Sequence, residues 1–214
     1  MVERLIDRGV ELSTETELGD SAIYIAGRCQ DPEVIKLLLD NGANVNDRGG
    51  KHYEDRWDWL QRTEYNATPL HRAAENGRTE TARLLIEASA DVNSVDGSGV
   101  SVLERAVNSE KAELIRLLID AGVGLIIHDN TASGLLMVAV RSPGPDAIYL
   151  VNHLLEKGID VNVRYKGYYG TALYYVAWDG DIDMARHLLE NGARIEEADD
   201  HGKTALSRLG SMGV

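Results

Sequence analysis

Residues 67–93 have the sequence ATPLHRAAENGRTETARLLIEASADVN, and this stretch decides the fold. Thr68 is placed to cap a helix whose first turn begins with Pro69, where a missing N–H removes no hydrogen bond. Asn76 and Gly77 then supply a left-handed turn that ends the helix. Four residues follow at the spacing of one helix face: Thr81, Leu84, Leu85 and Ala88. That spacing predicts a second helix whose apolar stripe faces a neighbouring unit.

The unit recurs along the chain. Its end is marked by a pair of Leu or Ile residues, two further residues, and then a glycine or its equivalent. The six marker positions are Gly9, Gly42, Ser89, Gly122, Gly158 and Gly192. Their spacings of 33, 47, 33, 36 and 34 residues are one period with two insertions. Segments 21–26, 101–106, 134–139 and 171–176 align with 68–73, and each keeps an aliphatic third residue that we expect to be buried.

The unit closely resembles the ankyrin repeat, and the resemblance covers nearly the whole chain. It implies an all-α solenoid of stacked helix–turn–helix units with projecting finger loops. About five full repeats are expected within one domain, residues 1–214, with partial repeats at both ends. The expected boundaries are 1–13, 14–46, 47–93, 94–126, 127–162, 163–196 and 197–214. His71 occupies the family's histidine position, which implies hydrogen bonds that tie neighbouring loops together.

The chain ends leave two alternatives open. A solenoid needs terminal repeats with a polar outer face, and neither end of this sequence offers an obvious one. The sequence is therefore either a piece of a longer array or a short protein capped by half-repeats, and we favour the first. The expected state is a monomer or a part of a longer chain.

Composition predicts a soluble intracellular protein. The single cysteine, Cys29, excludes an internal disulfide framework and suits a reducing compartment. No leader pattern opens the chain, and no apolar run approaches the roughly 20 residues that a bilayer requires. A net charge of −13 has the wrong sign for binding a phosphate backbone. We therefore expect no nucleic acid partner, no membrane association and a cytoplasmic location, with the nucleus as the alternative.

The finger before Thr68 carries an insertion. The helix cap Thr68 lies 22 positions after Asn46, whereas Ser101 lies 8 positions after Asn93, so 14 extra residues lie in this finger, at about 48–62. Tyr53, Trp57 and Leu60 fall at i, i+4 and i+7, which predicts one apolar face of a short helical turn. The insertion is either a binding element or a satellite core that packs back onto the adjacent helices.

Aromatic residues gather in two clusters. Of the twelve Trp and Tyr residues, four lie in the finger segment 47–65 that contains the insertion, and six lie from Tyr165 to Trp178. The family resemblance implies that fingers and first helices line a concave partner-binding face, on which Trp178 and Asp179 are exposed. Such aromatic surfaces are typical of protein interfaces. The predicted partner-binding residues are Tyr53, Trp57, Trp59, Tyr65, Tyr165, Tyr168, Tyr169, Trp178 and Asp179, with Trp178 foremost. For Tyr174 and Tyr175 we favour packing within the repeat.

Catalytic and metal-binding patterns are weak. The insertion holds four residues that could supply a base or a ligand set, namely His52, Glu54, Asp55 and Asp58, but no two match a known ligand spacing. Residues 179–183 resemble a calcium loop only superficially, because the downstream bidentate Glu is missing. His153 and His187 are expected to pack on helices. We predict no catalytic residue, no metal, no cofactor and no enzymatic activity.

The leading functional hypothesis is a protein–protein interaction scaffold that binds a protein or peptide on its concave and finger face. One alternative is an enzyme or small-molecule-binding protein built on the same scaffold, with a pocket near the insertion and Trp178. Another is a structural spacer of a larger multidomain protein. The identity of the partner does not follow from the sequence, because repeat surfaces diverge while their cores persist.

Overall fold

The computed structural model describes residues 12, 14–17, 19–50, 66–124, 129–142, 145–164, 170–199, 201–202, 204–205 and 207. The chain divides into two compact units, Met1–Gly124 and Leu125–Val214. Among the described residues, helices and three isolated antiparallel bridges make up the regular structure. None of the described helices is long and apolar enough to cross a bilayer. The prediction of an all-α architecture is confirmed.

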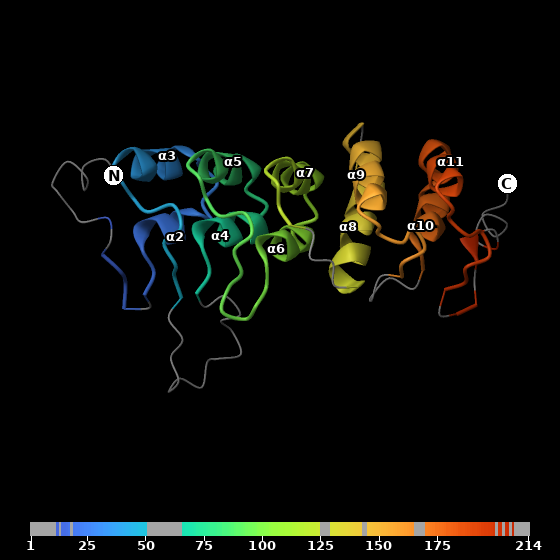
Figure 1. Cartoon of the computed structure of the whole chain (residues 1–214), viewed down its shortest axis with the longest axis horizontal. Coiled ribbons are helices and arrows are strands. Elements are labelled where there is room, and N and C mark those ends of the chain that lie inside the picture. The colour runs from blue at the N-terminus through green and yellow to red at the C-terminus, as the bar shows by residue number, and fades with distance from the viewer. Residues whose placement is uncertain are drawn as a thin grey trace. The chain divides into compact units, whose positions relative to one another are not determined.

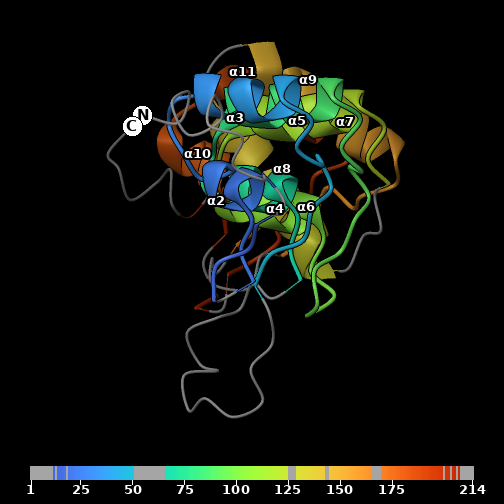
Figure 2. The same ribbon diagram turned by 90° about the vertical axis from the view of Figure 1, so that its left-hand side faces the viewer.

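The first unit stacks helix pairs in two layers. Its helices are α2 (Ala22–Ala26), α3 (Glu33–Asp40), α4 (Pro69–Glu75), α5 (Thr79–Glu87), α6 (Val102–Asn108) and α7 (Ala112–Asp120). Figures 1 and 2 show α2, α4 and α6 side by side in one layer and α3, α5 and α7 in the other. Helices α2, α4 and α6, the first of each pair, pack on the second helices α3, α5 and α7, and within the same layer α2 packs on α4 and α4 on α6. This arrangement buries the apolar stripes predicted from their spacing.

The starts of the first helices follow the predicted capping chemistry. Thr68 stands at the N-cap of α4 in extended backbone, its side chain accepts the His71 N–H, and Pro69 is the first helical residue. Ser101 caps α6 in the same way and accepts the Glu104 N–H at 3.2 Å. Each cap satisfies an N–H that a helix leaves without an intrahelical partner. The aligned motifs therefore begin helices because their first residue carries a side-chain acceptor.

The second unit contains α8 (Asp129–Arg141), α9 (Pro145–Glu156), α10 (Ala172–Asp179) and α11 (Ile182–Glu190). Helix α8 packs on α9 and α10, and α10 packs on α11. One expectation is wrong in this unit: the alignment places Gly134 at a helix start, but α8 begins five residues earlier, at Asp129. Glycine has no side-chain oxygen to accept the N–H groups of a new helix, so nothing starts the helix there.

The marker positions of the period share one backbone conformation. Among the described residues, the four marker glycines and Ser89 all have positive φ, between 68° and 89°. Gly9 lies outside the described part of the chain. A left-handed residue ends each second helix, and an L side chain costs energy in that conformation. Ser89 adopts the left-handed conformation despite its side chain, which confirms that it occupies the glycine position of the period.

The core runs through the aliphatic third positions of the first helices. These residues, Ile23, Leu70, Leu103, Leu136 and Leu173, are each at most 3% exposed. They come from both units, including the segment where the helix start was wrong. Burial was therefore predicted more reliably than the helix boundary, because burial depends on the recurrent pattern and not on one cap.

The finger before α4 is fixed at its base. Gly49 and Ala67 form an antiparallel bridge, in which the Gly49 N–H donates to the Ala67 carbonyl at 3.0 Å. The Gly50 N–H donates to the carboxylate of Asp20 at 2.8 Å. The base of this finger is thereby attached to the preceding repeat.

Arg48 attaches the same finger to the following repeat. Its Nη1 donates to the carbonyls of Asn66 and Val95 at 2.7 and 2.8 Å. The backbone on both sides of the insertion therefore has a defined place. Residues 51–65, which include the predicted face of Tyr53, Trp57 and Leu60, lie outside the described residues.

Candidate partner-binding surface

The turn between α10 and α11 is set by two helix ends. Gly180 follows α10 with φ of 74°, the left-handed conformation that stops a helix. Asp181 is the N-cap of α11, and its carboxylate accepts the Met184 N–H at 3.0 Å. The turn therefore consists of Gly180 and Asp181, between Asp179 at the end of α10 and Ile182 at the start of α11.

Two large apolar side chains flank this turn and face solvent. Trp178, in the last turn of α10, is 44% exposed, and Ile182, the first residue of α11, is 71% exposed. Asp179, Asp181 and Asp183 are also exposed. We call these five residues the α10–α11 edge. It combines apolar area with carboxylates on a stretch of six consecutive residues.

Tyr174 lies on the other side of α10 and belongs to the core. It is buried, and its hydroxyl donates to the Asp199 carboxylate at 3.0 Å. A Cβ on Gly170 would lie 2.7 Å from Cγ of Tyr174, so the ring fills the space that this glycine leaves. Tyr175 meets the ring edge-on, with centroids 5.3 Å apart. The interpretation of both tyrosines as repeat packing agrees with these contacts.

The structure places two of the nine predicted partner-binding residues. Trp178 and Asp179 are both exposed, as expected for surface positions. The other seven, Tyr53, Trp57, Trp59, Tyr65, Tyr165, Tyr168 and Tyr169, lie outside the described residues. Partner binding by any of the nine stays a prediction.

Ile182 was missed by the sequence reasoning. It lies in residues 179–183, which the sequence led us to consider only as a calcium loop, since three aspartates surround it. The signal was its register. The second helices of the first unit, α3, α5 and α7, begin with Glu33, Thr79 and Ala112, whereas α11 begins with a large apolar residue.

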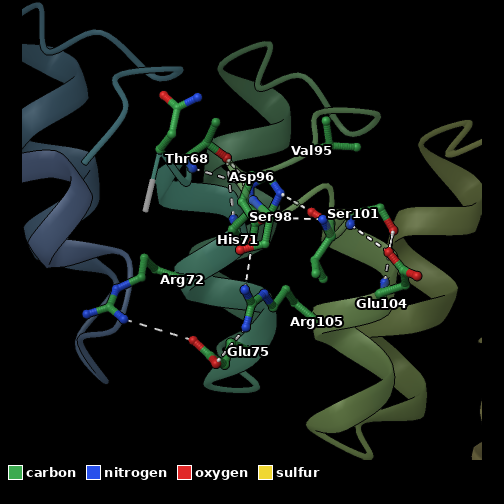
Figure 3. A network of polar contacts seen from close by, with 12 residues as sticks. Thr68, His71, Arg72, Glu75, Val95, Asp96, Ser98, Ser101, Glu104 and Arg105 are labelled. Atoms are coloured by element: carbon green, nitrogen blue, oxygen red, sulfur yellow. Dashed lines mark hydrogen bonds and ion pairs between the residues drawn. The ribbon is translucent and has the colours of Figure 1, made fainter. Parts of the chain in front are cut away.

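A second cluster of polar residues lies in the first unit, where Asp96 holds a finger loop together (Figure 3). Its Oδ1 accepts the N–H groups of Ser98 and Val100 at 2.8 and 3.0 Å. Its Oδ2 accepts a hydrogen bond from Nη2 of Arg105. The Asp96 side chain has no exposed surface, so it requires these partners to remain charged.

Arg105 extends this cluster between helices. Its Nη1 lies 3.3 Å from the Glu75 carboxylate, so α6 is tied to α4, as Figure 3 shows. Arg72 lies 3.9 Å from the same carboxylate, and its guanidinium stands 5.1 Å from the ring centroid of Tyr24 in α2. The contacts link three consecutive repeats. They position the fingers relative to the helices.

His71 fastens the next finger, as the family resemblance implied. Its Nε2 lies 3.2 Å from the Val100 carbonyl, which can only accept, so Nε2 carries the proton. Nδ1 is then an acceptor, and it takes hydrogen bonds from the N–H of Thr68 at 3.2 Å and from its hydroxyl at 2.8 Å. This arrangement requires a neutral imidazole.

Burial lowers the pKa of His71 to about 4, with smaller lowering contributions from Arg105 and Arg48. Asp96 and the Val100 carbonyl act in the opposite direction. An unfolded histidine has a pKa near 6.5, so between roughly pH 6.5 and pH 4 the unfolded chain binds a proton that the native state does not. Stability therefore falls as the pH is lowered through this window.

We expect His71 to contribute about 2 kcal/mol to the loss of unfolding free energy between pH 7 and pH 5. Urea titrations at both pH values would measure it against His71→Gln. Glutamine does not titrate and can keep the capping arrangement, because Glu104 performs it at the equivalent position of α6. An identical pH dependence in the two proteins would show that His71 does not titrate as described.

The described residues offer little for metal chemistry. They contain no group of three or more His, Cys, Asp or Glu side chains placed to hold a metal ion. His187 instead lies with Nε2 2.7 Å from Oδ1 of Asn152, and His153 stacks on Tyr149 with centroids 6.2 Å apart. His187 of α11 therefore contacts α9, and His153 packs against a residue of its own helix, α9.

Stacked pairs of short antiparallel helices, joined by left-handed turns and bridged fingers, define the class of helical repeat scaffolds. The chain belongs to the ankyrin repeat family. Models of ankyrin repeats match residues 18–50, 53–129 and 154–208. The resemblance noted in the sequence is thereby confirmed.

Curated relatives match over almost the whole chain but only part of their own length. Human palmitoyltransferase ZDHHC17 is 37% identical over 203 residues, which is 94% of this chain and 30% of that protein. Human palmitoyltransferase ZDHHC13 is 30% identical over 205 residues, which is 95% of this chain and 30% of that protein. The chain thus spans about a third of the length of these relatives.

Solved structures show the same fold. The ankyrin repeat domain of human ASB11 has a TM-score of 0.63 and 23% identity, and the match covers 97% of this chain and 85% of that one. The ankyrin repeat domain of Bcl-3 has a TM-score of 0.56 and 22% identity, with the same coverage. These similarities concern the fold, which serves generally as a protein–protein interaction scaffold.

Proposed function

We propose that this chain is a non-enzymatic interaction module that binds a protein or peptide partner, with Trp178 as a principal contact. The observation that carries the proposal is the register of Trp178. Trp178 is the seventh residue after the cap Thr171, and the seventh residues after the caps Ser21, Thr68 and Ser101 are Arg28, Glu75 and Asn108. The fold accepts polar residues at this position, so the repeat pattern does not require a tryptophan there.

Exposure of this residue costs free energy that binding would recover. A large aromatic side chain that is 44% exposed leaves apolar area in water. Tryptophan is enriched among interface residues that dominate affinity, because it buries a large area with few rotatable bonds. Trp178 is therefore suited to act as an anchor for a partner.

The scaffold supports binding by being already ordered. In the first unit, buried polar contacts hold the fingers to the helices through Asp96 and His71. A surface that is formed before binding loses little conformational entropy when a partner arrives. The matched relatives are named as palmitoyltransferases, and the match covers 30% of their length. We propose that the shared region contributes binding and carries no catalytic step.

Replacement of Trp178 by Ala should weaken partner binding by about 2 kcal/mol, or roughly 30-fold. Partners would be captured from lysate by the unaltered chain, identified by mass spectrometry, and titrated with the purified variants. Tyr149→Ala is the matched control, because Tyr149 is another exposed aromatic of the same unit, at 38%. Circular dichroism would establish that both variants stay folded. Equal loss in both variants, or no loss in either, would contradict the role of Trp178.

A further inference from the structure

We infer that the α10–α11 edge binds a basic segment of the partner, in which an apolar side chain contacts Trp178 and Ile182 while Lys or Arg side chains face Asp179 and Asp183. The inference rests on the proposed function, since it takes Trp178 to be a partner contact. It adds the chemical class of the segment that binds there.

The apolar part of the edge departs from the repeat pattern at two neighbouring positions at once. Trp178 replaces polar residues found at the equivalent places of other first helices. Ile182 is 71% exposed, whereas the second helices of the first unit, α3, α5 and α7, begin with Glu33, Thr79 and Ala112. Only residues 179–181 separate the two side chains in sequence. Two coincident departures in one repeat indicate a local contact surface and not a feature of the solenoid.

The charge of the edge also departs from the pattern. Asp181 occupies the N-cap of its second helix, whereas the equivalent N-caps of α5 and α7 are Arg78 and Lys111. The fold therefore accepts cations at this edge, and the second unit presents carboxylates instead. Residues 178–186 hold three carboxylates against one cation, Arg186. Among the residues that the structure describes, none forms a salt bridge with Asp179 or Asp183.

The combination of apolar area and carboxylates selects the occupant. A partner that covers Trp178 and Ile182 also removes water from the carboxylates beside them. Desolvating a carboxylate is costly unless a cation or a hydrogen-bond donor replaces the water. An apolar segment without charge supplies no such group, and an acidic segment adds repulsion. A segment with Lys or Arg flanking an apolar residue satisfies both parts of the edge.

The test is a selection of phage-displayed random dodecapeptides on the immobilised full chain, followed by counter-selection on the Trp178→Ala variant. Peptides that depend on Trp178 should be enriched in Lys or Arg next to Leu, Ile, Phe or Trp. A synthetic copy of the best peptide should bind Asp179→Asn/Asp183→Asn about tenfold more weakly at low salt, and the difference should shrink at high salt. Asp181 is left unchanged because its carboxylate caps α11.

The control variant is Asp40→Asn/Glu87→Gln, which removes the same charge from exposed residues at the ends of α3 and α5. It should change the affinity by less than about twofold. Two results would contradict a basic binding segment while keeping Trp178 as a contact. One is that the Trp178-dependent peptides are neutral or acidic, and the other is that the control variant loses as much affinity as Asp179→Asn/Asp183→Asn. Recovery of no Trp178-dependent peptide would overturn the proposed function together with this inference.

Discussion

Replacement of Asp96 by Ala should lower the unfolding free energy of the first unit by about 3–5 kcal/mol, because it removes the fully buried carboxylate that pairs with the buried Arg105 cation. The Arg105 side chain is only 8% exposed and donates to the Asp96 carboxylate. The same carboxylate accepts the N–H groups of Ser98 and Val100. Alanine removes the acceptor of all three groups, and each group that stays buried without one adds to the cost.

Urea unfolding followed by circular dichroism would measure this effect at pH 7. Asp91→Ala is the matched control, because Asp91 accepts a turn N–H from Asn93 at 3.0 Å but is exposed and pairs with no arginine in the described contacts. Its cost should stay below about 1 kcal/mol. The double variant Asp96→Ala/Arg105→Leu should recover part of the loss, since it also removes the buried Arg105 cation. No recovery would show that the buried cation is not the cause.

Gly49→Ala should cost about 3 kcal/mol, the upper end of the usual cost of overpacking. A Cβ at this position would lie 2.2, 2.4 and 2.5 Å from three ring atoms of Tyr24. The ring is buried and carries the Arg72 guanidinium over it, so it has little room to move. The clash would separate the finger base from the preceding repeat.

The cause can be isolated in a background that lacks the ring. Urea unfolding would compare Gly49→Ala in the native sequence with Gly49→Ala in a Tyr24→Leu protein. The substitution should cost less than about 1 kcal/mol once the ring is gone. A cost that is equal in both backgrounds would place the effect in the glycine backbone and not in the contact with Tyr24.

The fold was predictable where a few neighbouring residues decide the conformation. Thr68 and Pro69 start a helix through one side-chain oxygen and one fixed dihedral, and both lie where predicted. Ser89 adopts the left-handed conformation that its place in the period demanded. Gly134 was misplaced because the alignment transferred a cap to a residue that has no capping atom. Its buried neighbour Leu136 was still predicted correctly.

The candidate site was predictable only in part. The register of Trp178 and Asp179 in the first helix indicated surface positions, and both are exposed. Ile182 escaped notice because its neighbours in sequence are charged, although its place at the start of a second helix carries the signal. The buried ion pair of Arg105 and Asp96 also escaped notice, since charged residues in a repeat are usually solvated.

The sequence by itself determined the period, the helix pairs, the left-handed turns and the family, because caps, turns and apolar stripes depend on residues within a few positions of each other. Only the tertiary structure decided which polar side chains meet. Arg105 bridges Asp96, nine residues away, and Glu75, thirty residues away. His71 reaches the Val100 carbonyl of the next finger. These contacts arise from the stacking of one repeat on another, which brings together residues that no local pattern relates.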